Sequence, residues 1–206
     1  IFVNQDYHFT ADHDRPYIVD CGSNMGSSIL YFKKIYPRAI LCGFEPFEHA
    51  FQVLRRNVDA NDLQDVTIHK LALSDRKGRR RLFYDSSNPG SSVRSLCQEY
   101  AADAASITVE TTTLSGHIDR TVDFLKMDIE GSEISVMQDL QEAQKLPLIQ
   151  KAAIEYHHHV ATDADGLSRL LYILEQNHFG YHVHVILGHS RWTHQAQGIM
   201  IYAYRK

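Results

Sequence analysis

The chain has 206 residues, 44% of them hydrophobic, and a formal net charge of −4 at pH 7. This length and apolar content suit one domain with a sizeable core, so we expect a single domain over residues 1–206. A net negative charge argues against a nucleic-acid backbone as the main partner, and no apolar run approaches the roughly 20 residues that a membrane span needs.

The N-terminus and the cysteines indicate the setting of the protein. The chain begins at Ile1 without an initiator Met, so we expect part of a longer protein whose missing start could hold a signal peptide. Residues 1–16 show no periodicity and form either a cap over a site or a lead-in. Cys21, Cys42 and Cys97 show no C-x-x-C spacing, which favours a reducing compartment and a cytoplasmic location. Nothing here indicates an oligomeric state.

The first predicted strand leads into a glycine turn. The apolar run 17–19 ends in Asp20, Gly22 and Gly26 follow, and a helix is predicted over 25–36. This order is typical of the first half of a nucleotide-binding βαβ unit, in which the helix N-terminus points N–H groups at the ligand. A plain structural turn without a ligand is the alternative.

The second predicted strand, 40–44, ends in another acid, Glu45. An acid at this position can accept hydrogen bonds from two ribose hydroxyls. Pro46 then occupies a natural first position of a helix predicted to reach Asn61.

The spacing of the glycines indicates which nucleotide is bound. A dinucleotide site requires G-x-G-x-x-G, whereas here Ser23 stands where the second close glycine should be, and Asn24 follows it. An acid pointing into the site, Asp20, would repel a pyrophosphate but suits a cationic amino-acid end. S-adenosylmethionine (SAM) has such an end, and it has a ribose for Glu45.

An insert is predicted in the middle of the chain. A third strand over 66–71 runs into residues 72–75, and probable strands at 80–84 and 107–114 are expected to pair within an insert over 79–115. Three other features of this region are a basic cluster at 77–81, read as a solvated hairpin, a loop at 85–92, read as a lid, and an amphipathic helix near 96–104.

The last part of the chain completes an alternating pattern. The predicted elements are a strand at 122–127, a helix from Ser132, a strand at 149–156, a helix at 167–174, and antiparallel strands at 181–187 and 198–204. The whole predicts an α/β fold, a doubly wound, mostly parallel sheet of seven strands whose last strand is antiparallel, with helices on both faces.

Four stretches resemble the FkbM-type SAM-dependent methyltransferases, and the likeness covers residues 17–156. They are Ile-Val-Asp-Cys-Gly-Ser-Asn-Met-Gly at 18–26, Gly-Phe-Glu-Pro at 43–46, Ala-Leu-Ser-Asp at 72–75, and Lys-Met-Asp-Ile-Glu-Gly-Ser-Glu at 126–133. One departure is Ser115, where the family tends to have Asp after Thr-Leu.

This resemblance implies a class I, Rossmann-like methyltransferase fold, SAM as cofactor, and methylation of an oxygen on a sugar or natural product. It implies that SAM is bound by the residues Asp20, Gly22, Asn24, Gly26 and Glu45, with Ala72 and Leu73 beside the adenine. We also place Ser23, Pro46 and Asp128 in the cofactor site.

Candidate catalytic residues follow the predicted strands, where ligands sit in open α/β sheets. They are Asp128, Glu130, Glu155 and His157. His157 is the best single base, because the unperturbed pKa of histidine, about 6.5, lies near neutral pH. Glu130 and Glu133 can also be explained as first-turn acids that favour a helix dipole.

A divalent metal is a further alternative, with Asp128, Glu155 and His157 as oxygen and nitrogen ligands. His158 and His159 are weaker candidates, since a run of three histidines alternates between the faces of a strand. His182 and His184 share one strand face and are more simply explained as partly exposed residues.

Three functions compete at this point. The first is SAM-dependent O-methylation of a small-molecule or glycan acceptor. The second is an NAD-dependent oxidoreductase, which keeps Glu45 but lacks the third glycine and a second dinucleotide half. The third is a non-catalytic module that retains a SAM pocket.

Overall fold

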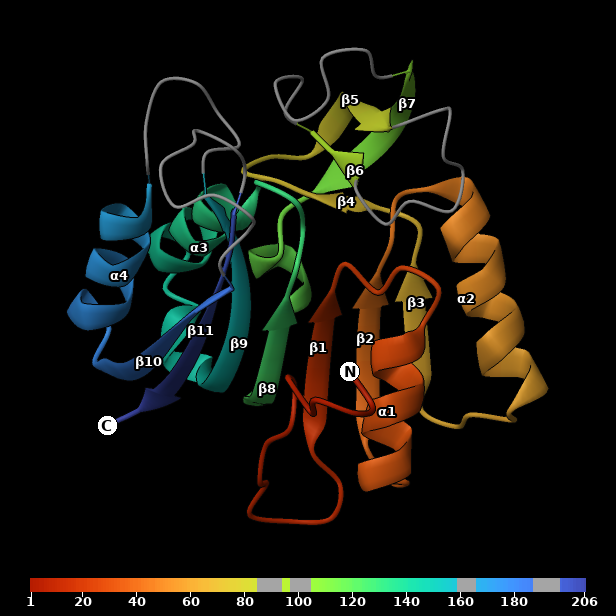
Figure 1. Ribbon diagram of the computed structural model, residues 1–206, viewed down its shortest axis with the longest axis horizontal. Coiled ribbons are helices and arrows are strands. Elements are labelled where there is room, and N and C mark those ends of the chain that lie inside the picture. The colour runs from red at the N-terminus through yellow and green to blue at the C-terminus, as the bar shows by residue number, and fades with distance from the viewer. Residues whose placement is uncertain (85–93, 97–104, 159–165, 187–196) are drawn as a thin grey trace.

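The computed structural model of the protein describes residues 1–84, 94–96, 105–158, 166–186 and 197–206 (Figure 1). Its main sheet has seven strands in the order β10-β11-β9-β8-β1-β2-β3. In chain order they are β1 (Tyr17–Cys21), β2 (Ile40–Phe44), β3 (Val66–His69), β8 (Val122–Met127), β9 (Ile149–His158), β10 (Phe179–Ile186) and β11 (Gln197–Arg205). Strand β11 pairs antiparallel with both neighbours and the other pairs are parallel. The predicted sheet is confirmed.

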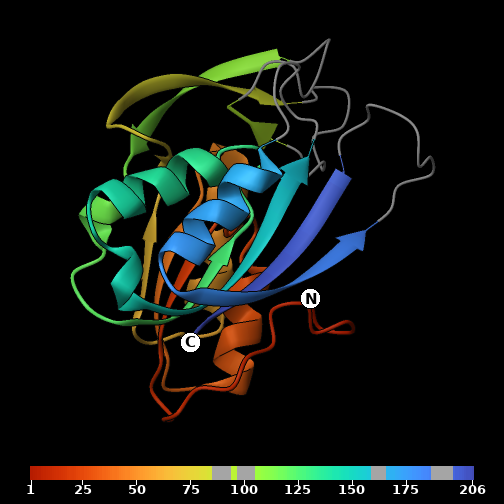
Figure 2. The same ribbon diagram turned by 90° about the vertical axis from the view of Figure 1, so that its left-hand side faces the viewer.

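Helices cover both faces of this sheet. They are α1 (Ser27–Ile35), α2 (Glu48–Ala60), α3 (Glu133–Glu142) and α4 (Leu167–Gln176), with short 3₁₀ turns at Ser115–His117 and Leu146–Leu148. Figure 2 shows α3 and α4 on one side of the sheet and α1 with the N-terminal segment on the other. Because side chains alternate along a strand, the strands feed two core clusters. One cluster contains α3 and α4, and the other contains α1, α2 and the N-terminal segment.

A small second sheet lies above the carboxyl ends of β1 and β2 (Figure 1). Its strands, in the order β4-β7-β5-β6, are β4 (Ala72–Leu73), β7 (Ala105–Thr112), β5 (Gly78–Tyr84) and β6 (Arg94–Ser95). The expected pairing of the strands near 80–84 and 107–114 is confirmed, since β5 and β7 are antiparallel neighbours. The proposed lid, 85–92, and nearly all of the helix expected at 96–104 lie outside the described residues.

Several predicted strand boundaries differ by one or two residues from the structure, and strand pairing explains the two that matter for the site. The third strand ends at His69 instead of continuing to residue 71, because the chain then crosses to the small sheet, where Ala72 pairs with Thr111. Strand β9 continues past Tyr156 to His158, because β11 extends alongside and places Gly198 opposite His157.

No helix within the described ranges has the length and apolar character that crossing a membrane requires.

Candidate active site

A cavity of about 240 Å³ lies between the carboxyl ends of the central strands and the small sheet. Both predicted cofactor-binding residues and predicted catalytic residues line this cavity. Its lining includes Gly22, Asn24, Glu45, Pro46, Leu71, Ala72, Leu73, Leu82, Asp128, Ile129, Glu130, Ser132 and Glu155. The glycine turn, the second-strand acid and the acids after β8 therefore face one space, as expected from the carboxyl ends of parallel strands.

The glycine turn brings the backbones of β1 and β8 close together. Gly22 has φ +83°, and a Cβ atom built there would lie 1.8 Å from the carbonyl oxygen of Asp128. Glycine is therefore required for both its conformation and its space. Gly26, with φ +89°, similarly leaves room for Leu54 of α2. Ser23 is buried, and its hydroxyl donates to the carbonyl oxygen of Asp20 at 3.1 Å, so it closes the turn instead of lining the cavity.

Asp20 is 0% exposed and is not among the residues that line the cavity. The hydroxyl of Ser28 donates to its Oδ2 at 2.5 Å, and the ammonium of Lys126 lies 3.4 Å from its Oδ1. The expectation that this acid points into the cavity is wrong. Asp20 and Lys126 are paired residues of the neighbouring strands β1 and β8. The carboxylate of Asp20 therefore pairs with the buried ammonium of Lys126 and does not face a ligand in the cavity.

Lys126 is a functional-site residue that sequence reasoning missed. Its Nζ donates to the carbonyl oxygen of Gly22 at 2.6 Å and lies 3.5 Å from Oδ2 of Asp128. Burial alone would lower the pKa of this ammonium, but the charges of Asp20 and Asp128 outweigh burial and raise it. Lys126 therefore stays charged and ties the glycine turn to β8. The available signal for Lys126 was its position at the start of the segment 126–133, which carries part of the family resemblance.

Glu45 is 5% exposed and is held in place by two backbone donors. The N–H of Asn24 donates to Oε2 at 2.9 Å, and the N–H of Phe47 donates to Oε1 at 2.8 Å. A carboxylate can accept several hydrogen bonds at once, and Glu45 lines the cavity. Glu45 can thus present a fixed acceptor to the cavity.

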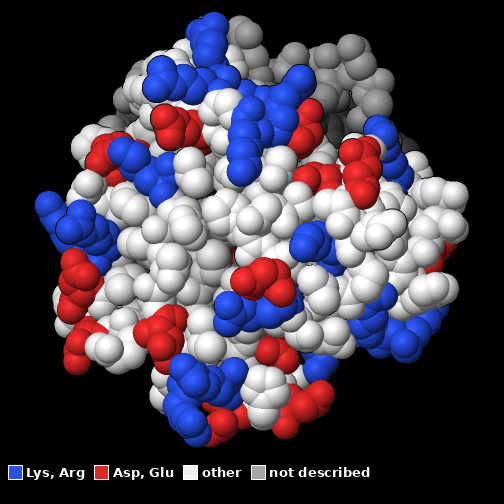
Figure 3. Space-filling view, turned by 180° about the vertical axis from the view of Figure 1, so that it is seen from behind, with Lys and Arg blue, Asp and Glu red and all other residues white. Residues whose placement is uncertain are grey.

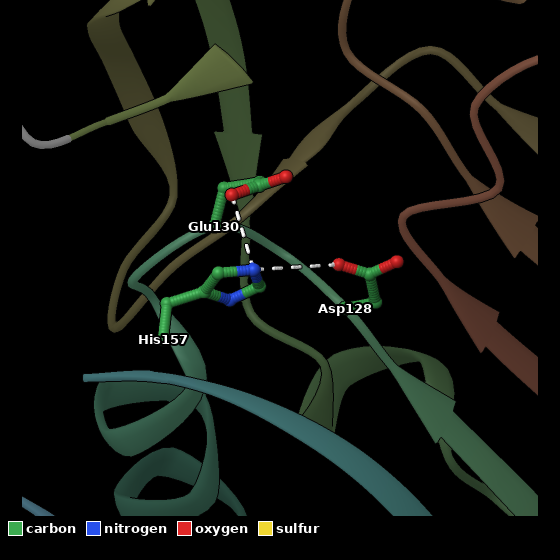
Figure 4. Close-up of side chains that lie close together, drawn as sticks. All are labelled: Asp128, Glu130 and His157. Carbon is green, nitrogen blue, oxygen red and sulfur yellow. Dashed lines mark ion pairs between the residues drawn. The ribbon is translucent and has the colours of Figure 1, made fainter. Parts of the chain in front are cut away.

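His157 lies among three carboxylates, those of Glu133, Glu130 and Asp128, of which Figure 4 draws the last two. Its Nδ1 is 2.9 Å from Oε1 of Glu133, and its Nε2 is 3.1 Å from Oε2 of Glu130 and 3.9 Å from Oδ1 of Asp128. Burial would lower the pKa of the imidazole, but the hydrogen bond and charge of Glu133, then Glu130 and Asp128, raise it to about 9. The expectation of a near-neutral histidine base is therefore wrong, because His157 carries its proton at pH 7.

Glu155 is the candidate acid that combines exposure to the cavity with a raised pKa. Burial raises the pKa of its carboxyl group, and the charge of Asp128 raises it further, against His157 and Lys126. The hydroxyl of Tyr7, from the N-terminal segment, lies 3.3 Å from its Oε2. A raised pKa makes this carboxylate a stronger proton acceptor than an ordinary glutamate.

The structure changes the candidate metal ligands. In place of the predicted Asp128, Glu155 and His157, it gathers Asp128, Glu130 and His157, whose ligand atoms all lie within 4.8 Å of one another. His158 and the ring of Tyr156 are neighbours on β9, and His159 lies outside the described residues. His182 and His184 are exposed on β10, as the simpler interpretation expected.

The basic cluster at 77–81 is part of a mixed-charge surface. Figure 3 shows Lys and Arg gathered at the top of the molecule with acidic side chains beside them. Arg80 lies 2.5 Å from Asp75, and Arg79 lies 3.6 Å from Glu110. This pairing supports the interpretation of a solvated hairpin.

Comparison with known proteins identifies the family to which these site residues belong. The family model described as the methyltransferase FkbM domain matches residues 20–183. Methyltransferase sdnD of Sordaria araneosa is 31% identical over 186 residues, which cover 75% of this chain and 71% of the relative.

Two solved structures have a similar fold. The crystal structure of methyltransferase FkbM from Methylobacillus flagellatus KT has a TM-score of 0.61 and 21% identity, and the match covers 95% of this chain but 45% of that chain. M. jannaschii TYW2, solved in complex with AdoMet, has a TM-score of 0.50 and 12% identity over 94% of this chain and 71% of its own. These likenesses show a class I methyltransferase-like fold, as the sequence predicted.

Proposed function

We propose that this chain, which belongs to the FkbM methyltransferase family, binds SAM in the cavity and transfers its methyl group to a hydroxyl oxygen of a sugar or natural-product-like acceptor. The observation that carries the proposal is the continuity of the cavity. One space joins the turn residues Gly22 and Asn24 and the acceptor Glu45 to the acids Asp128 and Glu155. The AdoMet complex of a protein with a similar fold supports the choice of cofactor.

The lining suggests how the cofactor is placed. Glu45 would accept hydrogen bonds from the ribose hydroxyls, and the apolar residues Ala72, Leu73 and Leu82 would contact the adenine. The acid-lined end near Asp128 and Glu155 would then receive the positively charged end of SAM. Asp20 would act indirectly in this arrangement, by holding Lys126 away from the ligand.

The reaction is an in-line displacement. The bond between the sulfonium sulfur and the methyl carbon breaks as a bond from the acceptor oxygen to that carbon forms, and the hydroxyl proton goes to a base. Alignment in the cavity supplies much of the acceleration. We assign the base to Glu155, since His157 already carries a proton. Glu155→Gln should lower turnover by about 10²- to 10⁴-fold.

A divalent ion is a second way to activate the hydroxyl. Asp128, Glu130 and His157 offer two carboxylates and one imidazole, a donor set that suits an ion such as Mn²⁺. Glu133 would hold the ring, as carboxylates commonly do for metal-bound histidines. Such an ion would acidify a bound hydroxyl and lower the demand on a protein base.

Calorimetry with SAM, S-adenosylhomocysteine (SAH) and NAD tests the cofactor. We expect SAM to bind more tightly than NAD, because Ser23 occupies the place of the glycine that a pyrophosphate needs. Tighter binding of NAD would favour an oxidoreductase and overturn the proposal.

Transfer from SAM with a labelled methyl group then tests the acceptor. The panel should contain glycosides and polyhydroxylated small molecules, with protein and RNA as separate arms, because the expectation of no nucleic-acid partner rests on net charge. We expect label on oxygen of a small acceptor. SAM binding without transfer to any arm would favour the non-catalytic module.

A further inference from the structure

The N-terminal segment is anchored beside the acid-lined end of the cavity. The ring of Phe9 stacks on Phe124 of β8 with centroids 4.2 Å apart, and the hydroxyl of Tyr36, the residue after α1, bonds the backbone of Phe9 and Ala11. Tyr7 is 4% exposed. The segment therefore packs on the main sheet and carries one tyrosine toward the site.

The hydroxyl of Tyr7 lies between two carboxylates from different strands. It is 3.3 Å from Oε2 of Glu155 on β9 and 3.5 Å from Oδ2 of Asp128 after β8. Burial raises the pKa of this phenol, and the surrounding carboxylates raise it further despite Lys126, so the phenol keeps its proton. With a single proton to donate, the shorter distance favours Glu155.

Such a donor affects the carboxylate in two ways. A hydrogen bond to the ionised form stabilises the negative charge of Glu155, and it restricts the directions in which the carboxylate can point. Since Glu155 lines the cavity and Tyr7 does not, the tyrosine acts on a ligand through the acid.

The geometry points to Tyr7 as a positioning residue that, through Glu155, makes the site prefer the sulfonium of SAM over the uncharged thioether of SAH. This inference rests on the proposed function. SAM and SAH differ in one methyl group and one positive charge, so a fixed negative charge near the sulfur should distinguish them. The preference would favour loading of the cofactor and release of its product.

The test compares the ratio of the two dissociation constants in matched variants. Tyr7→Phe removes the hydroxyl and keeps the ring, and we expect SAM binding to weaken about three- to tenfold with SAH binding nearly unchanged. Tyr36→Phe is the control, because it removes a different tyrosine hydroxyl that holds the same segment through Phe9 and Ala11. It should leave the ratio as it is in the wild type.

A second variant shows whether Tyr7 acts through Glu155. Glu155→Gln should lower the preference for SAM, and adding Tyr7→Phe to it should lower the preference no further. Glu155→Gln also tests the inference if Tyr7→Phe does not fold. An unchanged ratio of the SAM and SAH dissociation constants in Glu155→Gln would contradict the inference.

Three results would overturn the inference. They are an unchanged ratio in Tyr7→Phe, equal weakening of both ligands, and the same change in Tyr36→Phe. A wild type that binds neither SAM nor SAH would reject the proposed function first, and the role of Tyr7 with it.

Discussion

The Nδ1 atom of His157 lies 2.9 Å from Oε1 of Glu133, a carboxylate that is 1% exposed. Both oxygens of Glu133 also accept the backbone N–H of Gly131 at 3.1 Å. The backbone thus fixes the carboxylate, and the carboxylate fixes the ring. As a result the Nε2 atom faces Glu130 and Asp128, and the imidazole is a buried cation that neutralises several acids at the edge of the cavity.

The raised pKa of His157 predicts how stability depends on pH. The folded-state pKa of about 9 lies above the ordinary 6.5, so the stabilisation is fully present below pH 6.5 and is lost as pH rises through 9. It amounts to on the order of 3 kcal/mol. Urea unfolding at pH 6, 7.5 and 9.5, with a chelator present, measures the slope.

Two variants separate this slope from other titrations. Glu133→Gln removes the main group that raises the pKa and should flatten the loss of stability at alkaline pH. A matched change at an exposed histidine, His182→Asn, should leave the slope intact. A wild-type free energy of unfolding that stays level between pH 6 and 9.5 would contradict the assignment.

Lys126 provides a second prediction about stability. Lys126→Met should destabilise the fold by about 3–5 kcal/mol, because it leaves Asp20 buried without its counter-charge. Adding Asp20→Asn removes that charge and should restore part of the loss. Denaturant unfolding of the single and double variants measures both effects, with Lys34→Met as an exposed control. A double variant whose cost equals the sum of the costs of Lys126→Met and Asp20→Asn alone would mean that the two residues are not coupled.

The alternation of apolar strands and periodic helices was sufficient to predict the main sheet, because both faces are buried and each strand reads as an apolar run. The antiparallel end followed from the absence of a helix between the last two strands. The requirement for glycine at position 22 could also be predicted from the sequence. It depends on the local backbone conformation of the turn and on the close approach of another backbone segment.

The direction of Asp20 and the state of His157 could not be predicted in the same way. The partner of Asp20 is Lys126, more than a hundred residues later, and it meets Asp20 through strand register. His157 was expected beyond the end of its strand, whereas pairing with β11 keeps it within the strand and turns it toward acids on another segment. The direction of Asp20 and the surroundings of His157 both depend on the register of strands that are far apart in the sequence. Residue type and local spacing do not reveal that register.

Glu45 offers a test of the cofactor site. Glu45→Ala should weaken SAM binding roughly tenfold to a hundredfold, because it removes a charged acceptor for the ribose worth on the order of 1.5–3 kcal/mol. The domain should remain folded, since Glu45 and Asn24 both line the cavity, where water can reach the N–H of Asn24 that Glu45 accepts. Glu48→Ala, at an exposed acid three residues later, is the control. An unchanged dissociation constant in a folded Glu45→Ala would remove Glu45 from the site.

The cluster of Asp128, Glu130 and His157 predicts how the protein responds to a divalent ion. If the second route to activation operates, Mn²⁺ added to chelator-treated protein should bind at one saturable site, measured by calorimetry. Glu130→Gln removes a ligand and should abolish the binding, whereas Glu133→Gln only releases the histidine ring and should weaken it about 10- to 100-fold. His182→Asn should have no effect. Turnover that a chelator abolishes and Mn²⁺ restores would favour the ion over Glu155 as the activating group. Binding that is absent, or that survives Glu130→Gln unchanged, would leave the three side chains as an ion-pair cluster that supports the cavity wall.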